Sequence, residues 1–240
     1  MAQHISRKEL KQDKIRESFE HGAEAVISHQ KLALVVLLTI AVVAGAVLGS
    51  RFYKEQQTSQ ASNSLDEAMK IYSARIRAAN EPAEPGEVTY LDERNKYEDA
   101  LKKFSETADK YPRTNPGRLA RYYAGLCLEH LGRDNQAIEA LRKVESGGDK
   151  ELAGLARFQM AQIDDKMGKM DEATKLYRQM ADKPTVFVPK PLVMLYLAND
   201  LSRTNPQEAA KVYNQIKKEF PDSQIAEEAD RGLEAIGPKS

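Results

Sequence analysis

Histidine and cysteine, whose side chains most often serve catalysis or metal binding together with acids, are few in this sequence. The candidates are the four histidines, the one cysteine and two of the adjacent acid pairs: His4, His21, His29, His130, Cys127, Asp164-Asp165 and Glu227-Glu228. A metal site or an acid–base pair needs several such side chains close together, and neither acid pair has a histidine or cysteine at ligand spacing. The sequence also lacks a glycine-rich phosphate loop, a C-x-x-C pair and a G-x-S-x-G elbow. We therefore expect no catalytic residue, no metal, no cofactor and no enzymatic activity.

Cys127 stands between Leu126 and Leu128, in the middle of an expected helix, and is the only cysteine of the chain. A single cysteine cannot form a disulfide within the chain, so we expect it to be a small buried packing residue. Basic and acidic residues are equal in number, at 36 each. Nucleic-acid-binding proteins normally carry a basic excess, so we expect no nucleic-acid partner.

A continuous apolar run from Leu32 to Gly49 predicts a transmembrane helix over residues 32–50. Its eighteen residues, LALVVLLTIAVVAGAVLG, carry no charge, and Lys31 and Arg51 flank them. At about 1.5 Å per residue the run spans about 27 Å, close to the ~30 Å hydrocarbon core of a bilayer. The bilayer is therefore an expected partner. Cleavage as a signal peptide is an alternative because Ala44-Gly45-Ala46 fits a cleavage site, although the run and the segment before it are longer than usual.

The basic residues beside this run indicate its orientation. Within about twenty residues, the range over which the positive-inside rule acts, three precede the run and two follow it: Lys14, Arg16 and Lys31, against Arg51 and Lys54. The difference of one charge favours a cytoplasmic N-terminus and places the rest of the chain outside the cytoplasm. The reversed orientation is the alternative.

The segments around the run have their own character. Residues 1–31 read as a juxtamembrane segment with an amphipathic helix over residues 6–29 that starts at the capping box Ser6-Arg7-Lys8-Glu9. This helix either lies on the membrane surface or simply leads into the anchor. Within the run, Ala41, Gly45 and Gly49 recur every four residues, a pattern that lets two helices pack closely and predicts a homodimer through the anchor. Glycine is also common in transmembrane helices in general, which is the alternative reading. Residues 51–64 look like a stalk, and residues 65–240 form the remaining domain.

The chain after the stalk repeats itself with a period of 36 or 37 residues. Four alanines mark the repeat, and each is followed four positions later by a large apolar residue: Ala100, Ala137, Ala173 and Ala209, then Phe104, Leu141, Tyr177 and Tyr213. Gly132 and Gly168 precede two of the alanines by five residues, and Pro112 and Pro221 follow two of them by twelve. A period of this length predicts stacked helix pairs, each made of an A helix and a B helix. We therefore expect an all-α, right-handed helical solenoid of about four pairs, closed by a helix from Ile225 to Ile236.

These markers resemble the tetratricopeptide repeat family. The matching residues are Gly125, Gly132, Ala137 and Leu141 in one unit and Ala161, Gly168, Ala173 and Tyr177 in the next. The sequence departs from the family pattern in having no tryptophan, and Leu128, Asp164 and Asp200 stand where the family has tyrosine. The resemblance implies a concave groove, lined by the A helices, that binds other proteins. The groove positions that it implies here are Leu119, Tyr122, Leu126, Glu129, His130, Leu155, Phe158, Gln162, Asp165, Lys166, Met194 and Ala198.

A single span with a cytoplasmic N-terminus and a short repeat array together resemble the ancillary subunit of the bacterial Sec translocon, a periplasmic chaperone-like protein. We therefore expect a single-pass protein of the bacterial inner membrane whose groove binds client or partner polypeptides on the periplasmic side. The alternative is a structural scaffold subunit of a membrane or envelope-assembly complex, without an exchangeable client.

Overall fold

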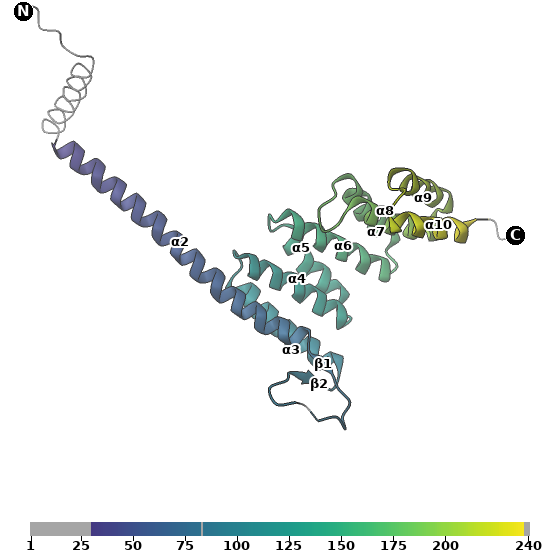
Figure 1. The fold of residues 1–240 in the computed structure, drawn as a ribbon, viewed down its shortest axis with the longest axis horizontal. Helices are drawn as coiled ribbons and strands as arrows, with labels where there is room; N and C mark the ends of the chain where they lie inside the picture. Colours follow the sequence, from purple (N-terminus) through teal and green to yellow (C-terminus); the bar gives the residue numbers. More distant parts are fainter. Residues whose placement is uncertain (1–29, 83, 238–240) are drawn as a thin grey trace, which may run out of the picture. The chain divides into compact units, whose positions relative to one another are not determined.

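The computed structural model describes residues 30–82 and 84–237, which are mostly helical (Figure 1). This part of the chain contains nine helices and two short strands, and 78% of the described residues are helical. The predicted amphipathic segment lies outside the described residues, apart from its last two positions. The chain divides into two compact units, residues 1–56 and residues 57–240.

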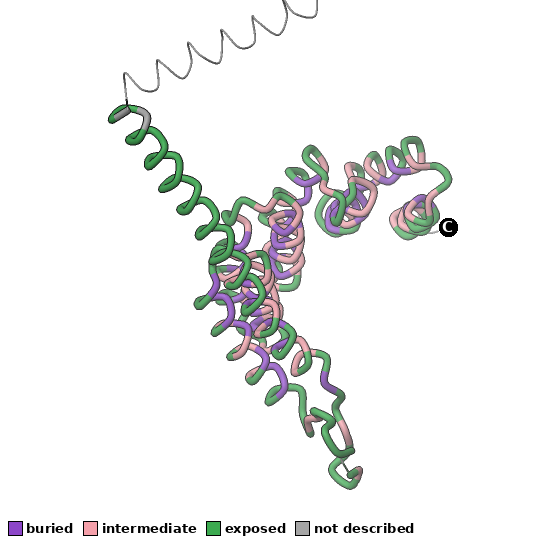
Figure 2. The backbone as a smooth tube through the Cα atoms, turned by 60° about the vertical axis from the view of Figure 1, so that its left-hand side comes forward, coloured by how far each residue is buried: buried purple, intermediate pink, exposed green. Residues whose placement is uncertain are grey.

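Helix α2 (Gln30–Tyr72) begins in the first unit. The described side chains before residue 57 are exposed (Figure 2). Among the described residues, α2 is the one helix with the length and composition of a membrane span, characteristics that a signal sequence near an N-terminus shares. Thr39, the one polar residue of the apolar run, donates its hydroxyl to the carbonyl of Val35 at 2.8 Å, so its side chain is satisfied within the helix.

The second unit starts inside the predicted stalk. Ala61 is fully buried, and Leu65 and Ala68 join it in the core. These residues of α2 pack with α3 (Glu93–Lys110), and the hydroxyls of Ser64 and Thr107 lie 2.7 Å apart between the two helices. The last turns of α2 therefore form the A helix of the first pair, and α3 is its B helix.

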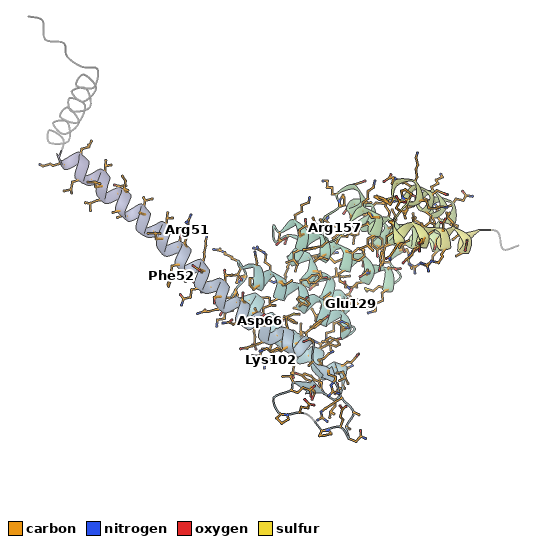
Figure 3. The ribbon with its side chains drawn as sticks, in the orientation of Figure 1. Arg51, Phe52, Asp66, Lys102, Glu129 and Arg157 are labelled. Carbon is orange, nitrogen blue, oxygen red and sulfur yellow. The ribbon has the colours of Figure 1, made fainter. Side chains whose placement is uncertain are left out.

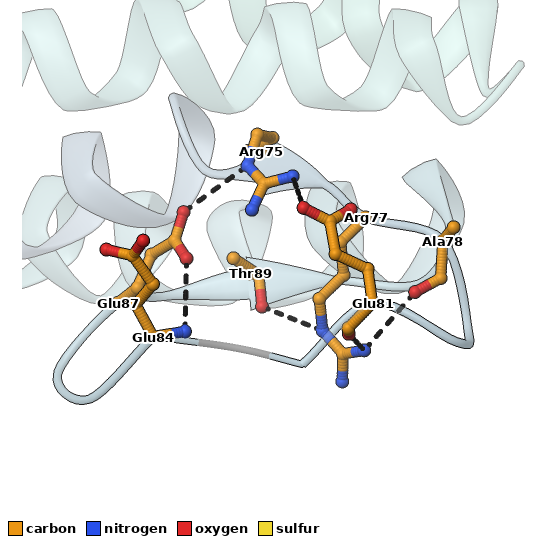
Figure 4. A network of polar contacts seen from close by, with 7 residues as sticks. All are labelled: Arg75, Arg77, Ala78, Glu81, Glu84, Glu87 and Thr89. Carbon is orange, nitrogen blue, oxygen red and sulfur yellow. Dashed lines mark hydrogen bonds and ion pairs between the residues drawn. The ribbon is translucent and has the colours of Figure 1, made fainter.

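Two strands separate α2 from α3, a feature that the all-α expectation did not include. Strand β1 (Arg75–Ile76) pairs in parallel with β2 (Thr89–Tyr90). Arg75 and Arg77 form polar contacts with residues of the segment that connects the two strands (Figure 4). Arg75 binds the carboxylates of Glu81 and Glu87 at 2.7 and 3.3 Å, and Arg77 donates to the Glu81 carbonyl at 2.6 Å and to Thr89 Oγ1 at 3.1 Å.

Three more helix pairs and a closing helix complete the second unit, and each helix packs on the one before it. The pairs are α4 (Asn115–His130) with α5 (Asp134–Glu145), α6 (Lys150–Lys166) with α7 (Met170–Asp182), and α8 (Lys190–Thr204) with α9 (Pro206–Glu219). Helix α10 (Gln224–Ile236) packs on α9 and α8 and closes the array. The predicted solenoid of four pairs plus a closing helix is confirmed.

The marker residues occupy the interior of these pairs. Ala100, Ala137, Ala173 and Ala209 are all fully buried. The large residues four positions later, Phe104, Leu141, Tyr177 and Tyr213, are exposed by 2% or less. Gly125 shows how close the helices come, because a Cβ at that position would lie 2.9 Å from the side chain of Leu141. Burial in the second unit follows the inner faces of the helices (Figure 2).

Glycine ends the A helices of the second and third pairs. Gly132 and Gly168 have φ of 71° and 77°, a conformation that costs glycine little and other residues more. The residue after each glycine donates its amide back into the helix, from Arg133 to the Leu128 carbonyl and from Lys169 to the Asp164 carbonyl, both at 2.8 Å. Three residues separate the helices at each of these turns, whereas Asn205 alone separates α8 from α9.

We predict that Phe104→Ala lowers the free energy of unfolding by about 3–5 kcal/mol, because it leaves a cavity at a fully buried position between α2, α3 and α4. Urea denaturation followed by circular dichroism measures this change. Lys102→Ala is the matched control, because Lys102 is exposed on the same helix and its truncation should change stability by no more than about 0.5 kcal/mol. Equal effects of the two substitutions would contradict the assigned core.

Candidate functional site

The A helices α4, α6 and α8 are joined side by side through contacts between their side chains. The Gln159 amide on α6 donates to Glu129 Oε2 on α4 at 2.5 Å. Arg203 on α8 forms an ion pair with Asp165 on α6. Side chains of the three helices therefore meet on one surface of the second unit, and Figure 3 shows Glu129 at the end of α4.

On α4, four of the five predicted groove residues are half-buried: Leu119, Tyr122, Leu126 and Glu129. Burial raises the pKa of Tyr122 to about 12, so its hydroxyl stays neutral and available as a hydrogen-bond donor. The fifth residue, His130, stacks its ring on Tyr97 of α3 with the centroids 4.1 Å apart. Its contact is therefore with the preceding pair.

On α6, Leu155, Phe158, Gln162 and Asp165 are half-buried and Lys166 is exposed. The ring of Phe158 meets Tyr177 of α7 and Tyr196 of α8 edge to face, at centroid distances of 6.1 and 4.9 Å. The ammonium of Lys166 lies 3.1 Å from Asp134 of α5. An aromatic cluster with charged residues near its edge thus spans the junction of α6 and α8.

The structure corrects the positions predicted on α8. Met194 is 3% exposed and Ala198 is fully buried, so both side chains are core residues and not part of the surface shared by the A helices. The buried residues of α8 follow those of α6 at a spacing of 37, with Val193, Leu197 and Ala198 matching Ala156, Met160 and Ala161.

The connections on both sides of α8 differ from those around α6: Asn205 alone separates α8 from α9, and seven residues precede α8 where four precede α6. A change of one residue rotates a helix face by about 100°, which exchanges groove and core positions. The solvent-facing side of α8 carries Leu192, Tyr196, Asn199 and Arg203 instead. The signal in the sequence was the absence of glycine from the S-R-T-N-P turn.

The two aspartates at the family's tyrosine position are buried and partnered. Asp200 is 1% exposed and accepts hydrogen bonds from Thr174 at 2.6 Å and from Arg203 at 2.9 Å. Burial raises the pKa of Asp164, and the nearby Lys169 counteracts part of that effect. Each aspartate connects neighbouring structural elements. Among the described residues, no group of three or more histidine, cysteine or acidic side chains is placed to hold a metal ion.

Cys127 is fully buried in the core formed by α2, α3 and α4. Burial raises the pKa of its thiol to about 12, because the thiolate would lose its hydration there. The thiolate is the nucleophilic form of cysteine, so the folded protein keeps this residue unreactive.

These features define a class of protein: a helical repeat array whose A helices present a shared surface. Comparison with protein families agrees. A family model described as a tetratricopeptide repeat-like domain matches residues 29–187, and one described as a tetratricopeptide repeat matches residues 192–223. The chain belongs to the tetratricopeptide repeat-like domain family. Repeats of this kind generally mediate protein–protein interactions, and their families are generally non-catalytic.

Solved structures give the same fold. The nearly identical TPR-like repeats of Podosopora anserina, described as kinesin light chain, superpose with a TM-score of 0.54 at 11% sequence identity over 75% of this chain and 86% of that chain. A variant of those repeats with a single substitution gives the same TM-score and is covered over 85% of its own chain. At this identity the likeness concerns the fold alone. No curated protein matches the chain.

We predict that thiol reagents label Cys127 in the folded protein more slowly than in the urea-unfolded chain by about a thousandfold or more, because reaction requires an unfolded fraction on the order of 10⁻³ or less. Time courses of labelling followed by mass spectrometry test this prediction. A variant with Cys127→Ala and Ser59→Cys is the control, because Ser59 is exposed and a thiol there should react at once. Rapid labelling of folded Cys127 would overturn its assignment as a packing residue.

Proposed function

We propose that this protein is a membrane-anchored module that binds segments of other polypeptides on the surface formed by α4, α6 and α8. The observation that carries this proposal is the set of half-buried apolar side chains on these A helices, chiefly Tyr122, Leu126, Phe158 and Tyr196. Half-buried aromatic and aliphatic groups offer contact area to a ligand without a large loss of rotamer entropy, because packing already restrains them.

The chemistry of this surface favours an apolar segment with a few polar groups. Glu129, Gln162 and Asp165 lie among the apolar residues and can accept or donate hydrogen bonds. The one basic residue predicted for the groove, Lys166, is already paired with Asp134. A partner held by its C-terminal carboxylate therefore fits this surface poorly, and a hydrophobic stretch in extended or helical form fits it better.

The anchor in this proposal is the apolar part of α2, over residues 32–50. The excess of one basic residue before the span supports a cytoplasmic N-terminus and repeats on the outer side of a bacterial inner membrane. There the module would act as an envelope chaperone or as an accessory to the Sec translocon. The resemblance in span, orientation and array length supports this finer role. Residues 57–240 then form the binding domain, and residues 51–56 connect it to the span.

A structural scaffold subunit is the second candidate. The observation in its favour is the row of small residues on α2, because a Cβ at Gly45 or Gly49 would meet no atom within 4 Å. Together with Ala41, these residues leave a helix face free for close packing against another transmembrane helix, including that of a second copy.

We predict that photo-crosslinkers placed at Leu126 and Gln162 capture a permanently unfolded, carboxymethylated polypeptide, whereas crosslinkers at Glu139 and Lys175 do not. The first two positions lie on the proposed surface and the other two are on B helices. Tyr122→Ala combined with Phe158→Ala should reduce capture by about tenfold or more, since aromatic contacts of this kind contribute ~1–2 kcal/mol each. Gel analysis of the crosslinked species measures both effects.

The matched control for that double variant is Tyr90→Ala with Phe220→Ala, which removes the same two residue types at half-buried positions outside the proposed surface. Circular dichroism checks that both double variants keep their helices. Capture that is equal in the two double variants would contradict the binding surface. If, in addition, an unrelated apolar span in place of residues 32–50 abolished recovery of a membrane complex, the scaffold function would be the correct one.

We predict that protease added to bacteria with a permeabilised outer membrane digests the repeat domain without lysis of the inner membrane. This follows from the cytoplasmic N-terminus that the flanking charges favour. Immunoblotting against a C-terminal tag measures the digestion, and a cytoplasmic protein that stays intact is the control. Protection of the domain until lysis would reverse the proposed orientation and make the module a cytosolic adaptor at the membrane.

A further inference from the structure

A small basic pocket lies where the turn between α3 and α4 meets the end of α5. Its volume is about 190 Å³. Four of its seven lining residues are cationic and none is acidic; the lining is Pro112, Arg113, Arg118, Arg121, Lys143, Val144 and Gly147. Since the whole chain carries equal numbers of basic and acidic residues, this concentration of charge is local.

The cations of the pocket are poorly satisfied within the described part of the chain. Arg118 Nε is buried and has no hydrogen-bond partner there, although the Nη2 of the same side chain donates to Asn115. Arg121 Nη2 donates to the Ala108 carbonyl at 3.2 Å and lies 3.5 Å from the carboxylate of Asp109, which is 82% exposed. The pocket therefore has donors to spare for a ligand.

Helix dipoles do not account for this cluster. Lys143 belongs to the last turn of α5, where a cation is favourable. Arg118, in contrast, lies in the first turn of α4, where the dipole already has a positive end and a cation is unfavourable. The four cationic side chains give the pocket the positive potential that attracts anions.

We propose that this pocket binds a phosphate-type oxyanion, either the phosphate of a lipid headgroup or free phosphate. Guanidinium groups present several donors in a plane and match the oxygens of phosphate well, and three of the four cations are arginines. The pocket is smaller than the ~300 Å³ at which sites for larger organic ligands begin, which also favours a compact anion.

The connectivity of the chain favours the headgroup as the source, a step that depends on the proposed anchor. The chain enters the second unit at residue 57. Close to that point, the hydroxyl of Tyr111 donates a hydrogen bond to Gln60 at 3.4 Å. Tyr111 directly precedes Pro112, which lines the pocket. The pocket therefore lies at the end of the unit from which the chain leads back to the candidate span.

An exposed apolar loop tip lies near the start of α6, a helix that begins three residues after Gly147 of the pocket lining. Val186 and Phe187 are 81% and 60% exposed. Their backbone amides donate to the Glu151 carboxylate in the first turn of α6 at 2.8 and 3.2 Å, so the backbone of the tip is satisfied and its side chains are free for contact. Apolar side chains beside basic groups are the combination that binds the surface of an anionic bilayer.

The test uses the full chain in lipid nanodiscs made of phosphatidylcholine with or without phosphatidylglycerol, and measures hydrogen exchange by mass spectrometry. We expect peptides over residues 112–121 and 141–147 to exchange about tenfold more slowly with phosphatidylglycerol present, as ~1.4 kcal/mol of added stabilisation gives. Arg113→Glu with Lys143→Glu should abolish the protection. Lys102→Glu with Lys211→Glu, which makes the same charge change at exposed positions outside the pocket, should retain it.

A second arm adds inorganic phosphate to the chain in neutral nanodiscs, with sodium chloride at the same ionic strength as the control. Protection by phosphate but not by phosphatidylglycerol would keep the site and assign it to free phosphate. Protection in neither arm, or protection that survives in the pocket variant, would overturn the proposal. Failure of the chain to enter nanodiscs would refute the anchor instead, and the phosphate arm on the chain in solution would still decide the pocket.

Discussion

The close approach of paired helices at four buried alanines is the constraint on which the rest of the solenoid depends. No disulfide is available to hold the helices together, so the fold relies on packing. At Ala100, Ala137, Ala173 and Ala209 the side chain is small enough for one helix to cross another, and the large residue one turn later fills the space between pairs. A pair cannot bury its apolar surface alone, so each one completes the core of its neighbour.

The surface proposed for binding is a consequence of this stacking. When the pairs pack in sequence, their A helices become neighbours, and side chains that are remote along the chain come into contact. Phe158 and Tyr196 meet in this way, as do Glu129 and Gln159. The half-buried state of these residues has the same origin, because each is partly covered by a neighbouring A helix. The basic pocket, in contrast, is formed by residues at helix ends and in turns.

The lengths of the turns are related to which face of each A helix is exposed to solvent. Three-residue turns containing Gly132 and Gly168 keep α4 and α6 in the same register, and the buried positions of the two helices agree. The register of α8 differs by one position, where the turn after the helix is shortened to Asn205 and the connection before it is lengthened. The same shift buries Met194 and Ala198 and turns Tyr196 toward Phe158.

The amino-acid sequence by itself determined the class of fold, because the spacing of small and large residues and the glycines at helix ends are local rules that each repeat obeys. It also determined the apolar run of α2, which depends on composition alone. Tertiary structure decided the rest. The rotation of α8 depends on how a shortened turn is absorbed against its neighbours, and the stacking of His130 on Tyr97 joins residues from two different helices. The basic pocket brings together Arg113, Arg118 and Lys143 from a turn and two helices. The periodicity of the sequence does not predict that these residues share a pocket, because their proximity depends on the packing of three separate segments.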